Sequence, residues 1–163
     1  MRIMGIDPGS LCMGYGIIDE NENPIGWGRV TVSGRLPLAQ RAARFFTAVE
    51  RLVEEQGVEV VAIEEVFYGK DVKALLKLAH CRGAVMASLA LHEIPVYEYT
   101  PAEVKQAVVG YGRADKEQVK LLVKQLLGIE EEISSDEADA LAVALCHNQR
   151  EGMRRALNHA AQP

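Results

Sequence analysis

The feature that most constrains the fold is a short apolar run flanked by two helical segments. Residues 60–63 read Val-Val-Ala-Ile and are apolar at every position. A strand that is apolar on both faces is typical of the centre of a sheet covered by helices on both sides. The segments 37–56 and 71–91 carry apolar residues at helical spacing, as helices that cover a sheet do. We therefore expect an α/β protein whose parallel strands are joined by helical crossovers.

Strand patterns also lie on either side of this unit. Residues 2–7, 13–19 and 25–32 are apolar segments separated by short polar turns, which predicts an antiparallel meander. Residues 96–99 follow the second helical segment and predict one more strand. The fold class is therefore α/β, a mixed sheet of about five strands in which an antiparallel meander is followed by parallel strands, flanked by helices.

The remaining segments read as helices. Thr100-Pro101 begins one, residues 115–128 form another, and a capping box at Ser134 and Glu137 begins a last helix that closes near Asn148. For the helix at 71–91, the core face is predicted to hold Val72, Leu75, Leu76, Ala79, Gly83, Met86 and Ala90.

Length and composition indicate one ordinary domain. A chain of 163 residues can bury a hydrophobic core, and we place the domain at 1–150, with 151–163 as a frayed C-terminal tail. No run of about 18 apolar residues occurs, so no membrane span is expected. Cys12, Cys81 and Cys146 are widely spaced without a CxxC pair, which indicates free thiols in a reducing, cytoplasmic compartment.

Acidic residues stand at the ends of two predicted strands and on the last helix. Asp7 ends the first strand and Glu64 the fourth, and ligands of open α/β sheets gather beyond the carboxyl ends of the strands. Asp136 and Asp139 are three residues apart and so project from one helix face. His147 lies about 12 Å along that helix from Asp139, too far to share a metal ion.

If these four carboxylates converge, their mutual repulsion requires cations. Oxygen ligands without paired His or Cys suit Mg²⁺, with Mn²⁺ as a substitute. Two such ions about 3.5–4 Å apart activate a water and stabilise the leaving oxygen in phosphodiester hydrolysis. The alternative is that the acids belong to turns, and that Asp136 only complements the helix dipole.

Four blocks of sequence, in this order, resemble the motifs of the RuvC-type Holliday-junction endonucleases, a bacterial family with a ribonuclease-H-like fold. They are residues 6–9, 63–67, 104–110 and 136–142. The resemblance covers roughly residues 1–150. It implies catalytic metal ligands at Asp7, Glu64, Asp136 and Asp139. It also implies that Lys105 and Lys116 lie close to the scissile phosphate. In some members of the family the third acid is a His, whereas this chain has Asp136.

The net charge of −5 argues against a nucleic-acid partner, but the charge is unevenly distributed. Residues 70–124 contain nine Lys or Arg and six Asp or Glu. Stripes of Lys are often only solvated helix surface, and the alternative is a surface that follows DNA phosphates. The candidate nucleic-acid contacts are Phe67, Tyr68, Lys70, Lys73, Lys77, Arg113 and Lys120. The resemblance supports base stacking by Phe67, while Tyr68 could instead pack against the sheet.

The expected function is a Mg²⁺-dependent, structure-selective endonuclease with two ions per site that resolves four-way DNA junctions. The resemblance further implies symmetric nicks with 5′-phosphate ends, a homodimer, and cooperation with the RuvA and RuvB branch-migration proteins. Two rivals remain. Asp7-Pro8-Gly9-Ser10 could be the phosphate turn of an actin-like or sugar-kinase-like ATPase, although the chain is too short for the second half-domain. A DNA-binding module without catalysis would keep the Lys stripes and use the acids as caps.

Overall fold

The computed structural model describes residues 1–66, 69–110 and 114–160. Its strands and helices follow one another as β1 (Arg2–Asp7), β2 (Cys12–Asp19), β3 (Pro24–Thr31), α1 (Leu38–Gln56), β4 (Val60–Glu64), α2 (Val72–Leu91), β5 (Val96–Tyr99), α3 (Pro101–Val109), α4 (Lys116–Leu127) and α5 (Ser135–Ala160).

The strands form one mixed sheet in the order β3-β2-β1-β4-β5. β1, β2 and β3 pair antiparallel, and β4 lies parallel to both β1 and β5. This is the predicted meander followed by parallel strands, and the fold class is confirmed. The apolar run at 60–63 lies in β4, between β1 and β5, as expected of an inner strand.

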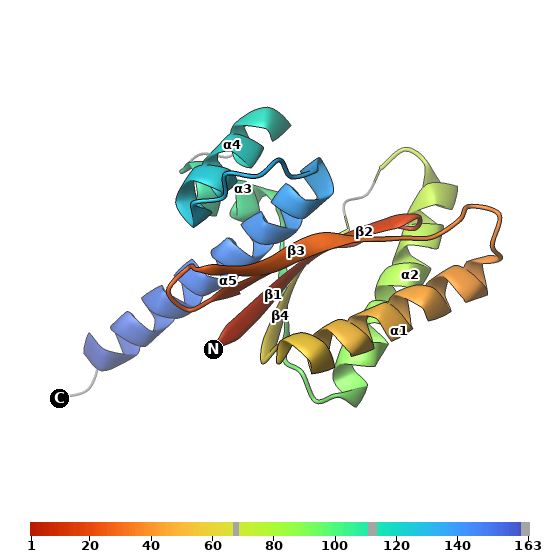
Figure 1. Ribbon diagram of the computed structural model, residues 1–163, viewed down its shortest axis with the longest axis horizontal. Helices are drawn as coiled ribbons and strands as arrows, with labels where there is room; N and C mark the ends of the chain where they lie inside the picture. Colours follow the sequence, from red (N-terminus) through yellow and green to blue (C-terminus); the bar gives the residue numbers. More distant parts are fainter. Residues whose placement is uncertain (67–68, 111–113, 161–163) are drawn as a thin grey trace.

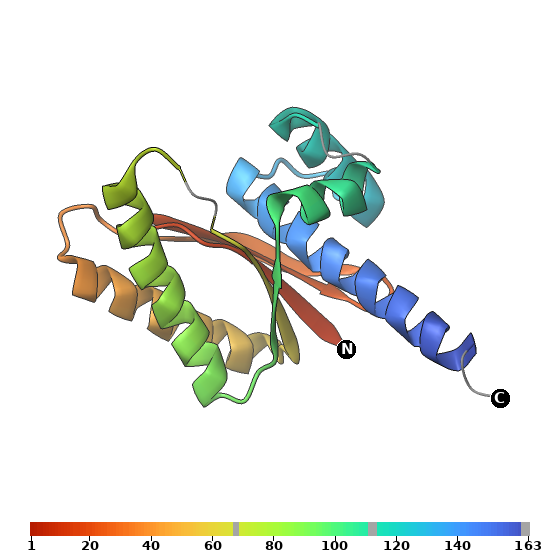
Figure 2. The ribbon, with the colours of Figure 1, turned by 180° about the vertical axis from the view of Figure 1, so that it is seen from behind.

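Helices cover both faces of the sheet, as Figure 1 and the reverse view in Figure 2 show. On one face, α1 and α2 pack through residues such as Phe45, Val49 and Leu89 against Met4 and Ile63. On the other face, α3, α4 and α5 form a second core with the same strands. The ends of β1 and β4, which carry Asp7 and Glu64, therefore lie between two layers of helices.

α5 lies unusually close to β1 and β2 because glycines face it. A Cβ atom added at Gly5 would overlap the carbonyl oxygen of Ala140, and one added at Gly14 would overlap the carbonyl oxygen of Asp136. Every residue of α5 from Ala140 to Cys146 is fully buried. The start of α5 is thus held against the strands by direct backbone contact.

α5 is longer than the sequence predicted. We expected it to end near Asn148 and residues 151–163 to fray, but the helix continues to Ala160 and projects past the sheet (Figure 1). The extension contains good helix formers and an ion pair of 2.8 Å between Arg154 and Glu151. The frayed tail is therefore wrong for residues 151–160.

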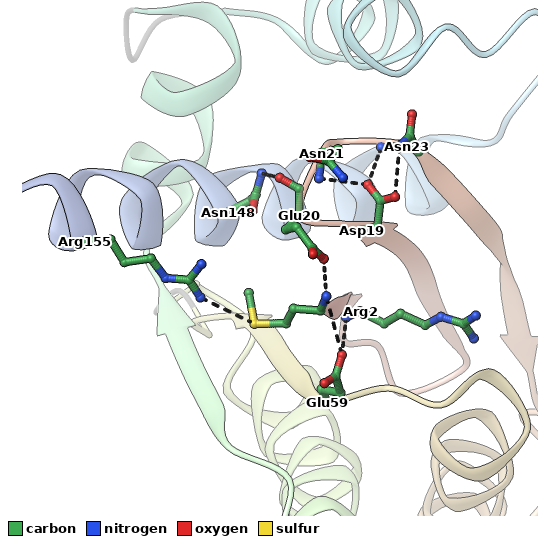
Figure 3. Close-up of polar contacts among 9 residues, drawn as sticks. Arg2, Asp19, Glu20, Asn21, Asn23, Glu59, Asn148 and Arg155 are labelled. Carbon is green, nitrogen blue, oxygen red and sulfur yellow. Dashed lines mark hydrogen bonds and ion pairs between the residues drawn. The ribbon is translucent and has the colours of Figure 1, made fainter.

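A polar cluster ties α5 to the end of the sheet opposite the carboxyl ends of the parallel strands. Figure 3 shows Asn148 beside the β2–β3 turn, where its side-chain amide donates to the carbonyl oxygen of Glu20 at 3.3 Å. Asp19 organises that turn by accepting from Asn21 and Asn23. These contacts stabilise the helix at the point where we had expected it to end.

The core face predicted for α2 is wrong except for Met86, which is partly buried against the core. The buried residues of α2 are Cys81, Val85, Ser88 and Leu89, whereas Leu76 is 54% exposed. Apolar residues surround most of this helix, so spacing alone did not select the buried side. By length and hydropathy α2 could cross a membrane. However, it packs on α1 and connects neighbouring strands of one sheet, which is the place of a crossover helix.

Candidate active site

The two acids at strand ends lie side by side. β1 and β4 are parallel neighbours with Ile6 paired to Ile63, so Asp7 and Glu64, the last residues of these strands, lie at the same end of the sheet. Arg82 of α2 holds the end of β4, because its Nε donates to the carbonyl oxygen of Glu64 at 3.3 Å.

The start of α5 brings the other acids to this edge. The backbone N–H of Glu137 donates to Ser134 Oγ at 3.2 Å, and the Glu137 carboxylate accepts from the backbone N–H of Ser134 at 2.6 Å. This is the predicted capping box. It fixes the first turn of α5, which carries Asp136 and, one turn further, Asp139.

A cavity of about 250 Å³ lies where these elements meet. Its charged lining residues are Asp7, Glu64, Asp139, Lys105 and Lys116, and we call it the acidic hollow. Lys116 Nζ lies 3.7 Å from Asp139 Oδ2. The two lysines that the resemblance placed near a phosphate therefore share a cavity with three of the acids.

Asp136, the fourth acid, is not among the described residues that line this cavity, and its side chain contacts β2. The thiol of Cys12 donates to Asp136 Oδ2 at 3.4 Å. Burial, together with this contact and the charge of Asp136, raises the pKa of Cys12 to about 11.

The carboxylates repel one another strongly. Burial raises the pKa of Asp7 to about 8, and the negative charges of Asp139, Glu64 and Asp136 add to that rise. Burial and Asp139 also raise the pKa of Glu64. The pKa of Asp139 is raised by burial in spite of Lys116. The lysines therefore offset only part of the negative charge.

This donor set fits a hard divalent cation. All four candidate ligands are carboxylates, which Mg²⁺ and Mn²⁺ prefer, and a cation would remove the repulsion that raises the pKa of Asp7. In residues 1–66, 69–110 and 114–160, no group of three or more His, Cys, Asp or Glu side chains is already arranged to hold a metal ion. Side-chain rotation would therefore have to accompany binding.

The predicted DNA contacts lie in different surroundings. Lys70, Lys73 and Lys77 are exposed at and near the start of α2. Lys120 instead pairs with Glu132 at 3.6 Å, and Lys124 pairs with the same carboxylate. Phe67, Tyr68 and Arg113 lie outside the described residues.

Some contacts around the site could not be predicted from any sequence motif. Cys12 meets Asp136 across 124 positions, and no motif marks that pair. Tyr99 Oη lies 2.8 Å from His147 Nδ1 in a buried pair. Arg150 joins α5 to α3 through Glu103 at 3.0 Å. The pair of Arg150 and Glu103 fixes α3, which carries Lys105, relative to the helix that carries the acids.

A mixed sheet whose central parallel strands end in carboxylates, with two more carboxylates on a crossing helix, is the arrangement of a ribonuclease-H-like nuclease. The model of the family described as Crossover junction endodeoxyribonuclease RuvC matches residues 3–147. This chain belongs to the RuvC family. The family recognised from the sequence motifs, the ribonuclease-H-like fold and the nuclease class are thereby confirmed.

Individual relatives agree. The RuvC of Caldanaerobacter subterraneus subsp. tengcongensis is 41% identical over 163 residues, covering 98% of this chain and 99% of the relative. That of Alkaliphilus metalliredigens is 42% identical over 151 residues, covering 90% and 92%. The solved structure of Thermus thermophilus RuvC in complex with a Holliday junction substrate is 34% identical, with a TM-score of 0.88 over 94% of this chain and 96% of that one. The yeast mitochondrial resolvase Ydc2 shares the fold at 14% identity and a TM-score of 0.71, over 94% and 80%.

Proposed function

We propose that this chain resolves four-way DNA junctions by hydrolysing phosphodiesters at the acidic hollow. The observation that carries the proposal is the convergence of Asp7, Glu64 and Asp139 with Lys105 and Lys116 in one cavity. Membership of the RuvC family supports the same reaction and substrate. The ATPase alternative loses its support, because a relative of about the same length, aligned over nearly all of this chain, is a nuclease.

Metal dependence is general in this family of nucleases. For this chain we propose two Mg²⁺ ions per site, with Mn²⁺ as a substitute, held by Asp7, Glu64, Asp136 and Asp139. When bound, such a pair supplies an activated water and stabilises the leaving oxygen. Calorimetric titration of the wild-type chain with Mn²⁺ should give two ions per chain, and a stoichiometry of one would contradict the count.

The two lysines have a separate role in the proposed reaction. Lys105 and Lys116 stand at the same cavity as the acids, where a cation offsets the charge that builds on the phosphate in the transition state. Lys116 lies 3.7 Å from Asp139 and so also restrains the orientation of that carboxylate. The proposed products are symmetric nicks with 5′-phosphate ends.

The site can be tested with variants of two neighbouring residues, one expected to be needed for cleavage and the other expected to be dispensable. Glu64→Gln should lower the cleavage rate of a synthetic four-way junction about 1,000-fold in Mg²⁺, because a metal ligand contributes several kcal/mol to the transition state. Glu65→Gln is the control, because Glu65 is exposed and strand alternation turns it to the other face. Asp7→Asn should bind the junction and fail to cut it.

Equal rates for Glu64→Gln and the wild type would overturn the site assignment. A wild-type chain that binds the junction and leaves it intact in Mg²⁺ would instead favour a DNA-binding module without catalysis. Linear duplex of the same sequence belongs in the same assay, because cleavage of both substrates at one rate would contradict junction selectivity.

We also propose a homodimer formed through α2. Val72, Leu76 and Leu91 are 50%, 54% and 74% exposed on this helix, and a large exposed apolar face marks an interaction surface. A two-fold pair would present two identical acidic hollows to a two-fold junction. In sedimentation, Leu76→Glu should give monomers, while Leu121→Glu should leave the dimer intact, since Leu121 is 57% exposed on α4.

The remaining contacts extend the same proposal. Lys70, Lys73 and Lys77 are exposed near the start of α2 and suit phosphates of the junction. Lys120 would have to leave Glu132 to join them. For Phe67, Tyr68 and Arg113 the support is the sequence alone. Family membership supports action in the cytoplasm with RuvA and RuvB.

A further inference from the structure

A second cavity, of about 490 Å³, lies between the end of β3 and α1. Arg44, Thr47, Ala48 and Arg51 line it from α1, and Thr31 and Ser33 line it from the β3 side. We call it the arginine hollow. None of the described residues that line it carries a carboxylate, so its polar groups are guanidinium and hydroxyl groups, which suit an anionic ligand.

The surrounding segment is the most basic part of an acidic chain. Residues 29–51 contain five Arg, no Lys and one acid, Glu50, in a protein of net charge −5. Glu50 lies 3.5 Å from His92 of α2, so it points toward the neighbouring helix. Arg51 has an ion pair of 3.7 Å with Glu55, but Arg51 is 71% exposed, and such surface pairs are weak.

One of the five arginines is structural. Arg41 Nε donates to the carbonyl oxygen of Leu36 at 2.9 Å, which holds the turn between β3 and α1. The side chains of Arg29, Arg35, Arg44 and Arg51 belong to exposed residues and remain on the surface around this turn.

The spacing on α1 suits a nucleic-acid backbone. Arg44 and Arg51 are seven residues apart and therefore on one helix face, about 10.5 Å apart along the axis. Successive phosphates of one strand advance about 3.4 Å along the duplex axis, so the two guanidinium groups could reach phosphates about three nucleotides apart. The short side chains of Thr47 and Ala48 between them leave room for a sugar–phosphate backbone.

The arginine hollow lies at the same end of the sheet as the acidic hollow, but on the face covered by α1 and α2, whereas the acidic hollow lies on the face covered by α3, α4 and α5. Thr31 at the end of β3 pairs with Cys12, and the thiol of Cys12 contacts Asp136. β3 is two strands away from β1, or about 10 Å at the usual strand spacing. A duplex arm that crosses this end of the sheet could therefore contact both cavities.

We propose that the arginine hollow binds the phosphodiester backbone of a duplex arm of the junction where that arm leaves the acidic hollow. This inference depends on the proposed function, since it names a second contact of the same substrate. The arm would cross the exposed edge of the sheet at β3. Arg44 and Arg51 would bind its phosphates, and Thr31 and Ser33 would lie beside its sugars.

The test compares two double variants that remove the same charge. Junctions with long arms of about 20 base pairs and short arms of about 5 are bound in Ca²⁺ across a series of salt concentrations. Arg44→Ala/Arg51→Ala should weaken binding of the long-arm junction about 10-fold and lower the salt slope by about 2. Binding of the short-arm junction should weaken less, because arms of about 5 base pairs extend only about 17 Å and reach fewer of the phosphates beside Arg44 and Arg51.

Arg154→Ala/Arg155→Ala is the matched control, because both residues lie in the exposed end of α5, far from the acidic hollow along the helix. Equal weakening by the two double variants would mean that only general charge matters, and it would overturn the inference. Unchanged long-arm binding by Arg44→Ala/Arg51→Ala would overturn it as well, and would leave a peptide partner at the β3 edge as the occupant to test.

The wild-type cleavage assay separates this inference from the function on which it depends. If the wild-type chain cuts the long-arm junction in Mg²⁺ while Arg44→Ala/Arg51→Ala binds it normally, only the arginine hollow is refuted. If the wild-type chain cuts no junction, the proposed function fails. Thermal melting of each variant within about 2 °C of the wild type would show that the fold is intact.

Discussion

The Cys12 thiol lies 3.4 Å from the Asp136 carboxylate and donates a hydrogen bond to it. This contact joins the first residue of β2 to the first turn of α5. It holds one carboxylate oxygen of Asp136 toward β2. Rearrangement of Asp136 toward a bound cation would therefore involve the thiol.

The Cys12 thiol should be unreactive at mildly alkaline pH. Its pKa is raised to about 11, so its thiolate fraction at pH 8 is far below that of an ordinary cysteine with a pKa of about 8.5, and alkylation should be about 100-fold slower. Asp136→Asn removes the charge that favours the protonated form and should accelerate alkylation. Mass spectrometry of iodoacetamide-treated protein measures both rates at Cys12. A faster reaction in the wild type than in the variant would contradict this account.

The stability of the metal-free protein should fall as the pH rises. The folded-state pKa of Asp7 is about 8, above an unfolded value near 3.9, so between about pH 4 and pH 8 the folded state binds the extra proton. In EDTA, the free energy of unfolding should therefore be lower at pH 8 than at pH 5.5, and Mg²⁺ should restore more stability at pH 8. Urea denaturation at both pH values measures these differences.

Asp7→Asn is the control for that titration, since it removes the group and leaves the other titrating residues. The variant should be more stable than the wild type at pH 8 in EDTA and should gain less from Mg²⁺. A pH dependence of the same size in the variant and the wild type would show that other groups, such as His92, whose pKa is also raised, cause it.

Gly5→Ala should destabilise the protein by about 3 kcal/mol, because the added methyl group overlaps the backbone of α5 at Ala140 and only a shift of the helix can relieve it. Gly26→Ala is the matched control in β3, where a Cβ atom meets nothing within 4 Å. Urea denaturation of both variants checks the difference. Similar stabilities for the two would contradict the close approach of α5 to β1.

Lys116→Met should lower the cleavage rate at saturating junction about 100-fold, as expected when a cation at the reacting phosphate is lost. It should also raise the pKa of Asp139 further, because Lys116 at 3.7 Å favours the ionised form of that carboxyl group. Single-turnover kinetics measure the rate, and Lys116→Arg should recover part of it. Unchanged turnover in the Met variant would remove Lys116 from the reaction.

The sequence was sufficient for the inner strand and for the strand ends that carry Asp7 and Glu64, whereas the order of the strands came from the structure. The apolar character of residues 60–63 indicated the inner strand. Once two parallel strands pair, acidic residues at their carboxyl ends lie close together. The capping box at Ser134 likewise fixed the start of α5, because capping is a local interaction.

Other features depend on tertiary packing that no local pattern contains. α2 is apolar around most of its circumference, so only its packing against α1 and the sheet selects Val85 and Leu89 as buried residues. The arginines of 29–51 are visible in the sequence, yet they form one surface only because α1 returns beside β3. The end of α5 was misjudged because its exposed last turns have no core pattern.

Backbone meets backbone where α5 crosses Gly5 and Gly14, and this junction sets the distance from the strand acid Asp7 to the helix acids Asp136 and Asp139. The glycine contacts set the spacing of the backbones that carry these acids, so repacking of side chains elsewhere in the interior should leave that spacing unchanged. The backbone positions of the acids therefore do not depend on side-chain packing in the rest of the core. Changes in the helical layer of α1 and α2 could alter DNA contacts or pairing of subunits while the reacting groups keep their spacing.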